Sequence, residues 1–338
     1  MPNNLTLSDL AQQTHNKELL PMVQEIVKPT TIFADMGCMQ SSDSLSDVTG
    51  IQGDIPHGTW VGLDKGVKAN KGTWKQKEEG MGLLEAWAIV NEKTMSVSPN
   101  PNRLRWENDS MHIQGMGEDA EFALLYGNPL QNPNTFLGFM PRFGYCTNWE
   151  GDIVAGYHQG ENHPLICNDA GGDEGKPLSY ILMVSTATSF SPRMIYPRYK
   201  EDNGIVYRHF DYENTLDEDG GNIRVAKSQF MIMMGLRIPN RRSVIRIANI
   251  DTSDDTCIKG LSNKLYEAFE ALPLSMKSSV NIYTTGHVTL ALRKLFNERV
   301  VPAKVADAVP KNAIGDVNFD NFILRRCYSM LNSEDHVA

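Results

Sequence analysis

The sequence predicts an α+β protein, in which helices and strands occupy different stretches of the chain instead of alternating regularly. Three observations lead to this class: a long helical pattern at 102–127, a group of strand-like runs between 181 and 250, and two amphipathic helical patterns after 259. The chain has 338 residues, which corresponds to about two domains at roughly 150 residues each. We find no internal repeat and no low-complexity tract in it.

The composition excludes several classes of protein. Hydrophobic residues make up 41% and charged residues 22%, as is typical of a globular chain. The 32 Lys and Arg against 41 Asp and Glu give a net charge of −9, which disfavours specific duplex binding. The first residues do not resemble a signal peptide, and no run approaches the roughly 20 apolar residues of a membrane helix. Five cysteines, odd in number and far apart, indicate free thiols in a reducing compartment.

The N-terminal part of the chain divides into two kinds of segment. Residues 5–28 have apolar residues at helical spacing, and Pro21 predicts two short helical pieces instead of one. The stretch 40–80 is glycine-rich, with few large aliphatic side chains to bury. We therefore predict extended strands joined by glycine turns, as a long hairpin. Residues 82–91 return to an apolar composition and rejoin a core.

The longest predicted helix covers 102–127. Its apolar and small residues lie on one face, at Ile113, Met116, Gly117, Ala120, Ala123 and Leu124. Gly127, followed by Asn128 and Pro129, gives the stop signal. The small residues Gly115, Gly117 and Ala120 are expected to let a sheet approach closely.

The second half of the chain contains the predicted strands and two more helices. The strand-like runs are 181–184, 193–196, 229–236, 244–250, 280–283 and 319–325. Apolar residues at helical spacing predict one helix at 261–272 and another at 288–295.

The segment 170–177 nearly matches a phosphate-binding P-loop. That loop requires Gly where Ala170 stands, and Ser or Thr where Pro177 stands. It should also open a helix, whereas Pro177 opens a strand. We interpret the segment as a polar loop.

Two further groups resemble metal sites. Cys146, His158, His163 and Cys167 lack the tight cysteine pairs of structural zinc sites, so we interpret them as a chance assortment. The segment 217–228 begins like a calcium loop, but Gly221 and Ser228 stand where ligands are required. A solvated acidic loop is the preferred interpretation, and a weak divalent-cation site within 201–222 remains the alternative.

Catalytic chemistry is not indicated either. The sequence contains no Gly-x-Ser-x-Gly motif, and the carboxylate pair Glu78-Glu79 is predicted to be too exposed to hold a tuned pKa. We therefore predict no catalytic residue, no cofactor and no metal ligand.

Several long phrases occur in an order that points to one family. They are GLLEAWAIVNEK at 82–93, LLYGNP at 124–129, FLGFMPRFG at 136–144, RMIYPR at 193–198, GLRIPNRRSVIRIANID at 235–251 and FILRRCYSMLNSE at 322–334. In these phrases and their spacing the chain resembles the major capsid proteins of short-tailed double-stranded DNA phages, with the Hong Kong ninety-seven type shell fold. The match is weakest at 145–180.

The resemblance implies a division of the chain. It implies an N-terminal arm at 1–45, an extended loop at 46–80, a peripheral domain at 81–250 with spine helix 102–127, and an axial domain at 251–338. In the commonest version of this fold axial helices precede the long peripheral strands. Here the order is predicted to be reversed, which suggests a permuted topology.

The resemblance also implies a function. Such a protein self-assembles into hexamers and pentamers, which close an icosahedral shell around the phage genome, and is located in the virion after assembly in the host cytoplasm. Portal, scaffold or decoration proteins are further expected partners, packaged DNA is contacted only non-specifically, and no membrane is involved. The alternatives are an encapsulin-type nanocompartment shell and, more distantly, a hydrolase built on the axial domain.

The extended loop is the predicted assembly site. Its glycines raise the entropic cost of ordering it, so neighbouring subunits are expected to order it. Trp60 and Trp74 are its large apolar anchors, and at least one is expected to be buried across a subunit boundary. Five lysines without an intervening acid are expected to meet an acidic neighbour: Lys65, Lys68, Lys71, Lys75 and Lys77.

Overall fold

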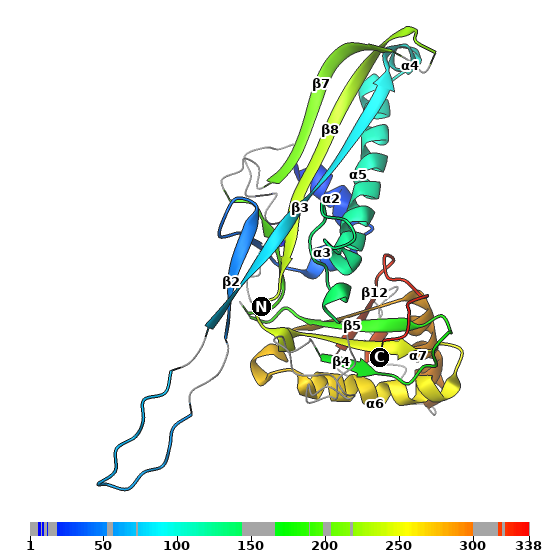
Figure 1. The fold of residues 1–338 in the computed structure, drawn as a ribbon. Helices are drawn as coiled ribbons and strands as arrows, with labels where there is room; N and C mark the ends of the chain where they lie inside the picture. Colours follow the sequence, from blue (N-terminus) through cyan, green and yellow to red (C-terminus); the bar gives the residue numbers. More distant parts are fainter. Residues whose placement is uncertain are drawn as a thin grey trace.

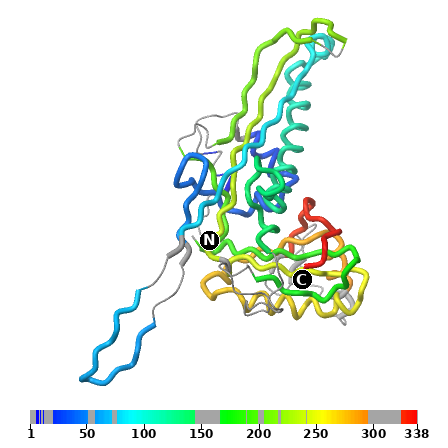
Figure 2. The backbone as a smooth tube through the Cα atoms, in the orientation of Figure 1, coloured from blue at the N-terminus to red at the C-terminus, as the bar shows by residue number. Residues whose placement is uncertain are grey.

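The computed structural model describes residues 6, 7, 9, 12, 19–52, 57–71, 74–143, 166–188, 190–198, 204–216, 219–299, 317–319 and 322–337. They form a long upper lobe and a shorter lower lobe, and a hairpin projects away from both (Figure 1, Figure 2). No helix of the described ranges is long and apolar enough to cross a membrane.

The upper lobe is a twisted sheet covered on one face by helices. Its strands run in the order β1-β6-β8-β3-β2, and β7 also pairs with β8. The bounds are β1 Cys38–Gln40, β2 Ser46–Gln52, β3 Trp74–Asn91, β6 Arg193–Tyr196, β7 Ile205–Leu216 and β8 Asn222–Arg237. The helices are α2 Leu19–Val27, α3 Thr31–Asp35, α4 Glu92–Val97 and α5 Pro101–Tyr126. The α2 helix contains Pro21 in its first turn, where the missing N–H is tolerated.

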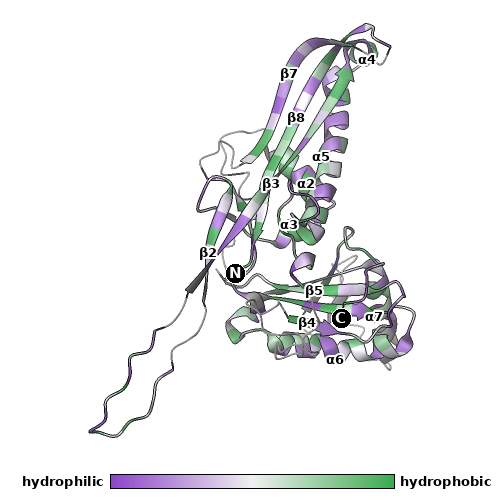
Figure 3. Cartoon of the chain, in the orientation of Figure 1, coloured by the Kyte–Doolittle hydropathy of each residue, from purple (hydrophilic) through white to green (hydrophobic). Residues whose placement is uncertain are grey.

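The predicted long helix is confirmed as α5, and capping residues explain its ends. The Asn100 side chain accepts a hydrogen bond from the Arg103 N–H at 3.2 Å, and Pro101 occupies the first turn. At the other end, a Cβ on Gly127 would lie 2.4 Å from the Ala123 carbonyl oxygen, so only glycine fits. Figure 3 shows hydrophilic residues along the side of α5 that faces away from the strands.

The two small glycines of α5 have a different role from the one predicted, whereas Ala120 is buried and lines a cavity with Ile205 and Ile232 of the sheet. A Cβ on Gly117 would lie 3.3 Å from Ile26, so this glycine allows α2, not a sheet, to approach. Gly115 faces open space. The sequence pattern identified the crowded face but not the element that packs on it.

The lower lobe is a second sheet with the order β11-β12-β10-β5-β9-β4. The bounds are β4 Ile166–Asp169, β5 Ser179–Ser185, β9 Val244–Ile250, β10 Val280–Thr284, β11 Val317–Phe319 and β12 Phe322–Arg326, with helices α6 Asp255–Ala271 and α7 Gly286–Arg299. Short 3-10 turns lie at Met140–Arg142, Arg241–Ser243 and Leu274–Met276. Alternate residues of β5 face opposite ways: Ile181 packs in the cluster that contains Leu261 of α6, and Leu182 packs in the cluster that contains Leu124 of α5.

The predicted assignment of strands to lobes is corrected by this topology. The runs 181–184 and 244–250 form β5 and β9 in the lower sheet, whereas 229–236 lies in β8 beneath the long helix. Both misassigned strands are buried on both faces, so their apolar runs carry no alternation that would indicate their sheet. A boundary at residue 250 therefore does not separate the two lobes. In chain order, β4 and β5 of the lower lobe lie between β3 and the long strands β7 and β8, and α6 and α7 follow β8. The lower lobe is therefore not built only from residues that follow the long strands.

The predicted hairpin is present at its base. Ser46 to Gln52 pair antiparallel with Gly80 to Trp74. Residues 57–71, beyond this paired base, are neither helix nor strand. We use the name extended loop for 46–80 and tip for 57–71.

Candidate assembly surfaces

The tip of the extended loop exposes large apolar side chains. Trp60 and Leu63 are fully exposed, at 102% and 107%, and Val61 and Val67 are also exposed. The tip points away from both lobes (Figure 1). Exposed apolar side chains grouped in one place mark surfaces that contact another molecule.

The predicted loop lysines divide into different environments. Lys65, Lys68 and Lys71 are exposed on the tip. Lys77 is half-buried, and its Nζ lies 2.8 Å from Glu79 Oε1 within the same chain. The side chains of Trp74 and Lys75 lie outside the described residues.

One strand of the extended loop is anchored to the body by a buried ion pair. Arg142 Nη1 lies 2.7 Å from Glu79 Oε1, and Arg142 Nη2 lies 3.1 Å from Glu79 Oε2. The same guanidinium group donates to the carbonyl oxygens of Gly138, Leu137 and Leu236. Glu79 is buried and its neighbour Glu78 is exposed, so the prediction that both carboxylates are exposed was wrong for Glu79. Successive side chains of a strand point to opposite faces, so the adjacent Glu78 and Glu79 have different surroundings.

The other strand is anchored in the same way. Buried Asp47 on β2 forms an ion pair with Arg237 of β8 at 3.1 Å and accepts the Ser42 N–H at 2.9 Å. The base of the extended loop is therefore fixed by two ion pairs. No residue in the described part of the chain covers Trp60 at the tip.

The face of the upper sheet opposite α5 carries a second exposed apolar surface. On β3, Leu83, Trp87 and Ile89 point away from the helix, with 49%, 43% and 54% exposed. The Trp87 and Phe210 rings stack at 5.5 Å, and Glu85 Oε1 accepts the Trp87 Nε1–H at 2.8 Å. By register, the neighbouring apolar positions on the same face are Val206, Met231 and Met233, while the polar Lys227 and Gln229 lie opposite Ile89 and Trp87. We call these residues the bare sheet face.

The segments that resemble a P-loop and metal sites show no metal-binding group within the described residues. The segment 170–177 is a turn that leads into β5, as predicted, and Lys176 pairs there with Asp251 at 3.0 Å. Cys146, His158 and His163 lie outside the described residues, as do positions 217 and 218, and Cys167 is buried in β4. No group of three or more His, Cys, Asp or Glu in the described ranges could hold a metal ion.

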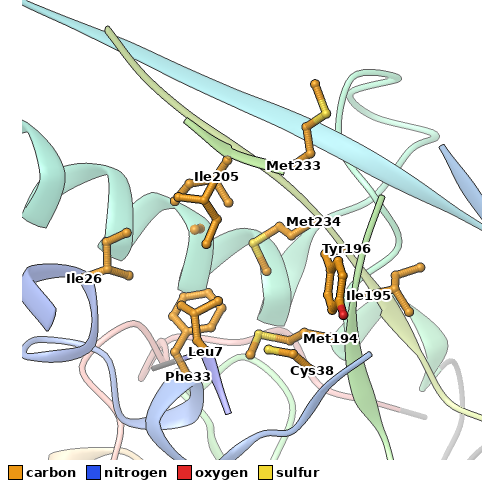
Figure 4. Close-up of a pocket in the computed structure, with 12 residues that line it drawn as sticks. Leu7, Ile26, Phe33, Cys38, Met194, Ile195, Tyr196, Ile205, Met233 and Met234 are labelled. Atoms are coloured by element: carbon orange, nitrogen blue, oxygen red, sulfur yellow. The ribbon is translucent and has the colours of Figure 1, made fainter. Parts of the chain in front are cut away.

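The buried thiols are not reactive, and the small cavity beside Cys38 is not a ligand site. Cys38, Cys167, Cys257 and Cys327 are free and buried, and burial raises the pKa of Cys38 and Cys327 to about 12, so neither is a nucleophile at neutral pH. The cavity beside Cys38 has a volume of about 30 Å³ and is lined by apolar side chains such as Leu7, Phe33 and Met194 (Figure 4). It is large enough for about one water but offers few polar partners, so it is no ligand site.

Comparison with known proteins identifies the family. Residues 15–338 match the family described as Major capsid protein GP7. The chain belongs to this family. A major capsid protein builds the icosahedral shell of a phage, so its location is the virion capsid and its role is structural, not catalytic. A comparison with curated protein sequences gives no match.

The chain is also similar to several solved structures. The structure of bacteriophage Epsilon15 matches with a TM-score of 0.60 and 21% identity, over 89% of this chain and 87% of that chain. The capsid of bacteriophage JBD30 gives 0.47 and 13%, over 90% and 92%. An encapsulin complex from Synechococcus elongatus PCC 7942 gives 0.38 and 9%, over 68% and 90%. The Epsilon15 match shows a mixed α/β shell fold of the Hong Kong ninety-seven type.

Proposed function

We propose that this major capsid protein assembles into hexamers and pentamers, in which the tip of each extended loop lies on the neighbouring subunit. The observation that supports this is the exposed Trp60 and Leu63 on a loop whose base is fixed by the Glu79–Arg142 and Asp47–Arg237 ion pairs. A loop held rigidly at its base presents its tip at a defined place, which reduces the entropic cost of binding.

The bare sheet face of the neighbouring subunit is the surface that we propose the tip covers. The tip and the bare sheet face both carry exposed apolar side chains. Contact between them removes both sets from water, which makes association of the subunits favourable. Their lengths also agree. The tip reaches at most about 35 Å beyond the Gln52–Trp74 pair, and the part of β3 that pairs with β8 is about as long.

Charge supports the same arrangement. Lys65, Lys68 and Lys71 on the tip are exposed. Asp211, on the β7 edge of the bare sheet face, is exposed too, whereas the exposed Glu213 on the same strand already forms an ion pair with Lys227 at 2.8 Å. Opposite charges that face each other across an interface favour correct pairing and fast association.

Finer features of the predicted particle are part of this proposal. The sequence phrases favour a short-tailed phage, and the net charge of −9 suits a wall that does not adsorb the packaged double-stranded DNA. Portal, scaffold or decoration proteins are proposed as further partners. We assign residues 1–45 to an N-terminal arm that packs in the upper lobe, the rest of the upper lobe to the peripheral domain and the lower lobe to the axial domain. In this assignment only α6 and α7 stand in the order expected of a permuted topology.

Electron microscopy of the purified protein tests the assembly. Closed shells with pentameric and hexameric units are expected, and protein that stays monomeric under all assembly conditions would contradict the proposal. The content of shells taken from infected cells separates a virus, which holds a genome, from a nanocompartment, which holds protein cargo. Images of the virion test whether the phage is short-tailed, because they show the length of its tail.

A further inference from the structure

The C-terminal segment 327–337 crosses the junction between the two lobes. It leaves β12 of the lower sheet, where the Cys327 N–H donates to the Thr284 carbonyl oxygen at 3.0 Å. Cys327 and Met330 are buried in the apolar cluster that also contains residues of α5. The segment therefore belongs to the core of both lobes.

Two hydrogen bonds connect this segment to α5 of the upper lobe. The Ser329 hydroxyl donates to Glu121 Oε2 at 2.7 Å, and the Leu331 N–H donates to the Tyr126 hydroxyl oxygen at 3.0 Å. Glu121 also accepts the Ile32 N–H at 3.1 Å through its other oxygen. One carboxylate on α5 thus holds both the start of α3 and the C-terminal segment.

The segment then returns to the lower sheet. The Glu334 N–H donates to the Leu178 carbonyl oxygen at 3.0 Å, and the Glu334 carboxylate forms an ion pair with Arg246 of β9. The Arg246 side chain is buried, the Glu334 side chain is only 10% exposed, and the Arg246 guanidinium lies 5.0 Å above the Tyr180 ring. A buried ion pair of this kind fixes geometry, because neither charge can leave without the other remaining unpaired.

Asn249 holds the end of the segment. Its side-chain Nδ2 donates to the Val337 carbonyl oxygen and its Oδ1 accepts the Val337 N–H, both at 2.9 Å. Asn249 has a φ of 57°, and it is the one non-glycine residue in the described part of the chain with a positive φ. Strained conformations of this kind persist where the surroundings require them. The two bonds to Val337 are such a requirement.

We propose that residues 327–337 are a clasp that fixes the angle between the two lobes, and that Asn249 is the positioning residue that holds its end. The subunits of one shell occupy places of different local curvature, and a rigid angle limits the curvatures that one subunit can adopt. The clasp itself rests on the contacts of the single chain. Its effect on shells rests on the proposed function as well.

Further connections limit how far the lobes can separate when the clasp opens. The lobes share an apolar cluster that contains Leu124 of α5 and Leu182 of β5, and the Tyr126 and Tyr180 hydroxyl groups are hydrogen-bonded at 2.7 Å. Asp35 at the end of α3 accepts a hydrogen bond from the Tyr283 hydroxyl at 2.9 Å and forms an ion pair with Arg325. Both partners lie in the lower sheet. We therefore expect opening of the clasp to widen the range of lobe angles without detaching the lobes.

The test compares two variants with a matched control in the full-length chain. Asn249→Gly keeps the positive φ and removes both bonds to Val337, together with the bond from Asn249 Nδ2 to Asp169 Oδ1 at 2.9 Å. Val337→Pro leaves the Asp169 bond in place and removes the Val337 N–H donor, along with a side chain that packs on the apolar cluster. His336→Ala, at an exposed neighbouring position, is the control. Hydrogen exchange in 327–337 should become at least tenfold faster in both variants, with α6 within twofold of wild type. Spin labels on Met111→Cys and Tyr266→Cys, both exposed, should give a broader distance distribution between the lobes.

Each outcome decides the proposal. Unchanged exchange in 327–337, or a distance distribution as narrow as that of wild type, would overturn the clasp. If hydrogen exchange in α6 also becomes fast in Asn249→Gly, this substitution unfolds the lower lobe. In that case the exchange and distance measurements on Val337→Pro decide whether the clasp exists. Variant shells are expected to vary more in diameter than wild-type shells, and variant shells as uniform as wild type would overturn the role in curvature. A wild-type chain that forms no shells contradicts the proposed function and leaves the single-chain test of the clasp intact.

Discussion

Arg142 holds the Glu79 carboxylate through two guanidinium nitrogens, at 2.7 and 3.1 Å, with both side chains almost completely buried. This contact joins the base of the extended loop to the segment that follows α5. It is the most completely desolvated contact at the base of the extended loop, so it determines how firmly the loop is attached.

Replacing one partner of this pair should be costly. Glu79→Gln leaves the Arg142 charge buried without a carboxylate, and we expect the free energy of unfolding to fall by about 3–5 kcal/mol. Chemical denaturation of the unassembled subunit measures it. Glu78→Gln, at the adjacent exposed position, is the control and should change the value by less than about 0.5 kcal/mol. Equal effects of the two substitutions would contradict the assignment of the ion pair.

The tip lysines should matter for assembly and not for folding. Replacing Lys65, Lys68 and Lys71 with Gln is expected to leave the melting temperature of the monomer unchanged, because exposed charges contribute little to stability. The yield of shells should fall, and wild-type assembly should weaken with added salt, which screens charges across an interface. Monomer melting and shell yield are measured side by side. A triple variant that assembles as well as wild type at every salt concentration would show that these lysines have another role.

Lys77 should behave differently from the tip lysines. Its Nζ is 2.8 Å from Glu79 in the same chain, so Lys77→Gln should lower the stability of the monomer by up to about 1 kcal/mol, as half-exposed ion pairs do. Denaturation of the single variant beside the triple variant separates the two classes of lysine. A variant in which all five loop lysines are replaced would therefore combine the folding effect of Lys77 with the assembly effect of the tip lysines.

The sequence was most informative where a pattern is local. The face of α5 and the hairpin base follow from helical spacing and from glycine-rich composition, and both are confirmed. The strands at 181–184 and 244–250 were assigned to the wrong sheet, because strands buried on both faces show no alternation. The Glu79–Arg142 pair spans 63 positions, and no local spacing signals a contact of that separation. Alternation along β3 places Glu78 and Glu79 on opposite faces but does not predict which one is buried, because Glu79 has the same parity as the exposed Leu83 and Trp87.

The pH dependence of stability should carry a contribution from Glu334. Burial raises the pKa of this carboxyl above its ordinary value, and the facing Arg246 opposes that shift only in part. A folded-state pKa above the unfolded one means that the folded chain binds the proton more tightly. The contribution is therefore fully present below the unfolded pKa and is lost as pH rises through the folded pKa. The difference in free energy of unfolding between wild type and Glu334→Gln should fall from pH 4 to pH 8. A flat or rising difference would contradict the sign of the shift, and Glu78→Gln, at an exposed position of β3, is the control.

Cysteine pairs test which surface of the neighbouring subunit receives the tip. Leu63→Cys on the tip and Leu83→Cys on the bare sheet face are both exposed, while the described native cysteines are buried and should not compete. Under mild oxidation, shells that carry both substitutions should form covalent chains of subunits, visible as ladders on a denaturing gel, because the tip of one copy lies on the sheet of the next. Met111→Cys, exposed on α5, replaces Leu83→Cys in the matched control and should give no ladder. A ladder with Met111→Cys and none with Leu83→Cys would place the tip on the helical side. The lack of a ladder in both cases would show that the tip binds neither surface of its neighbour.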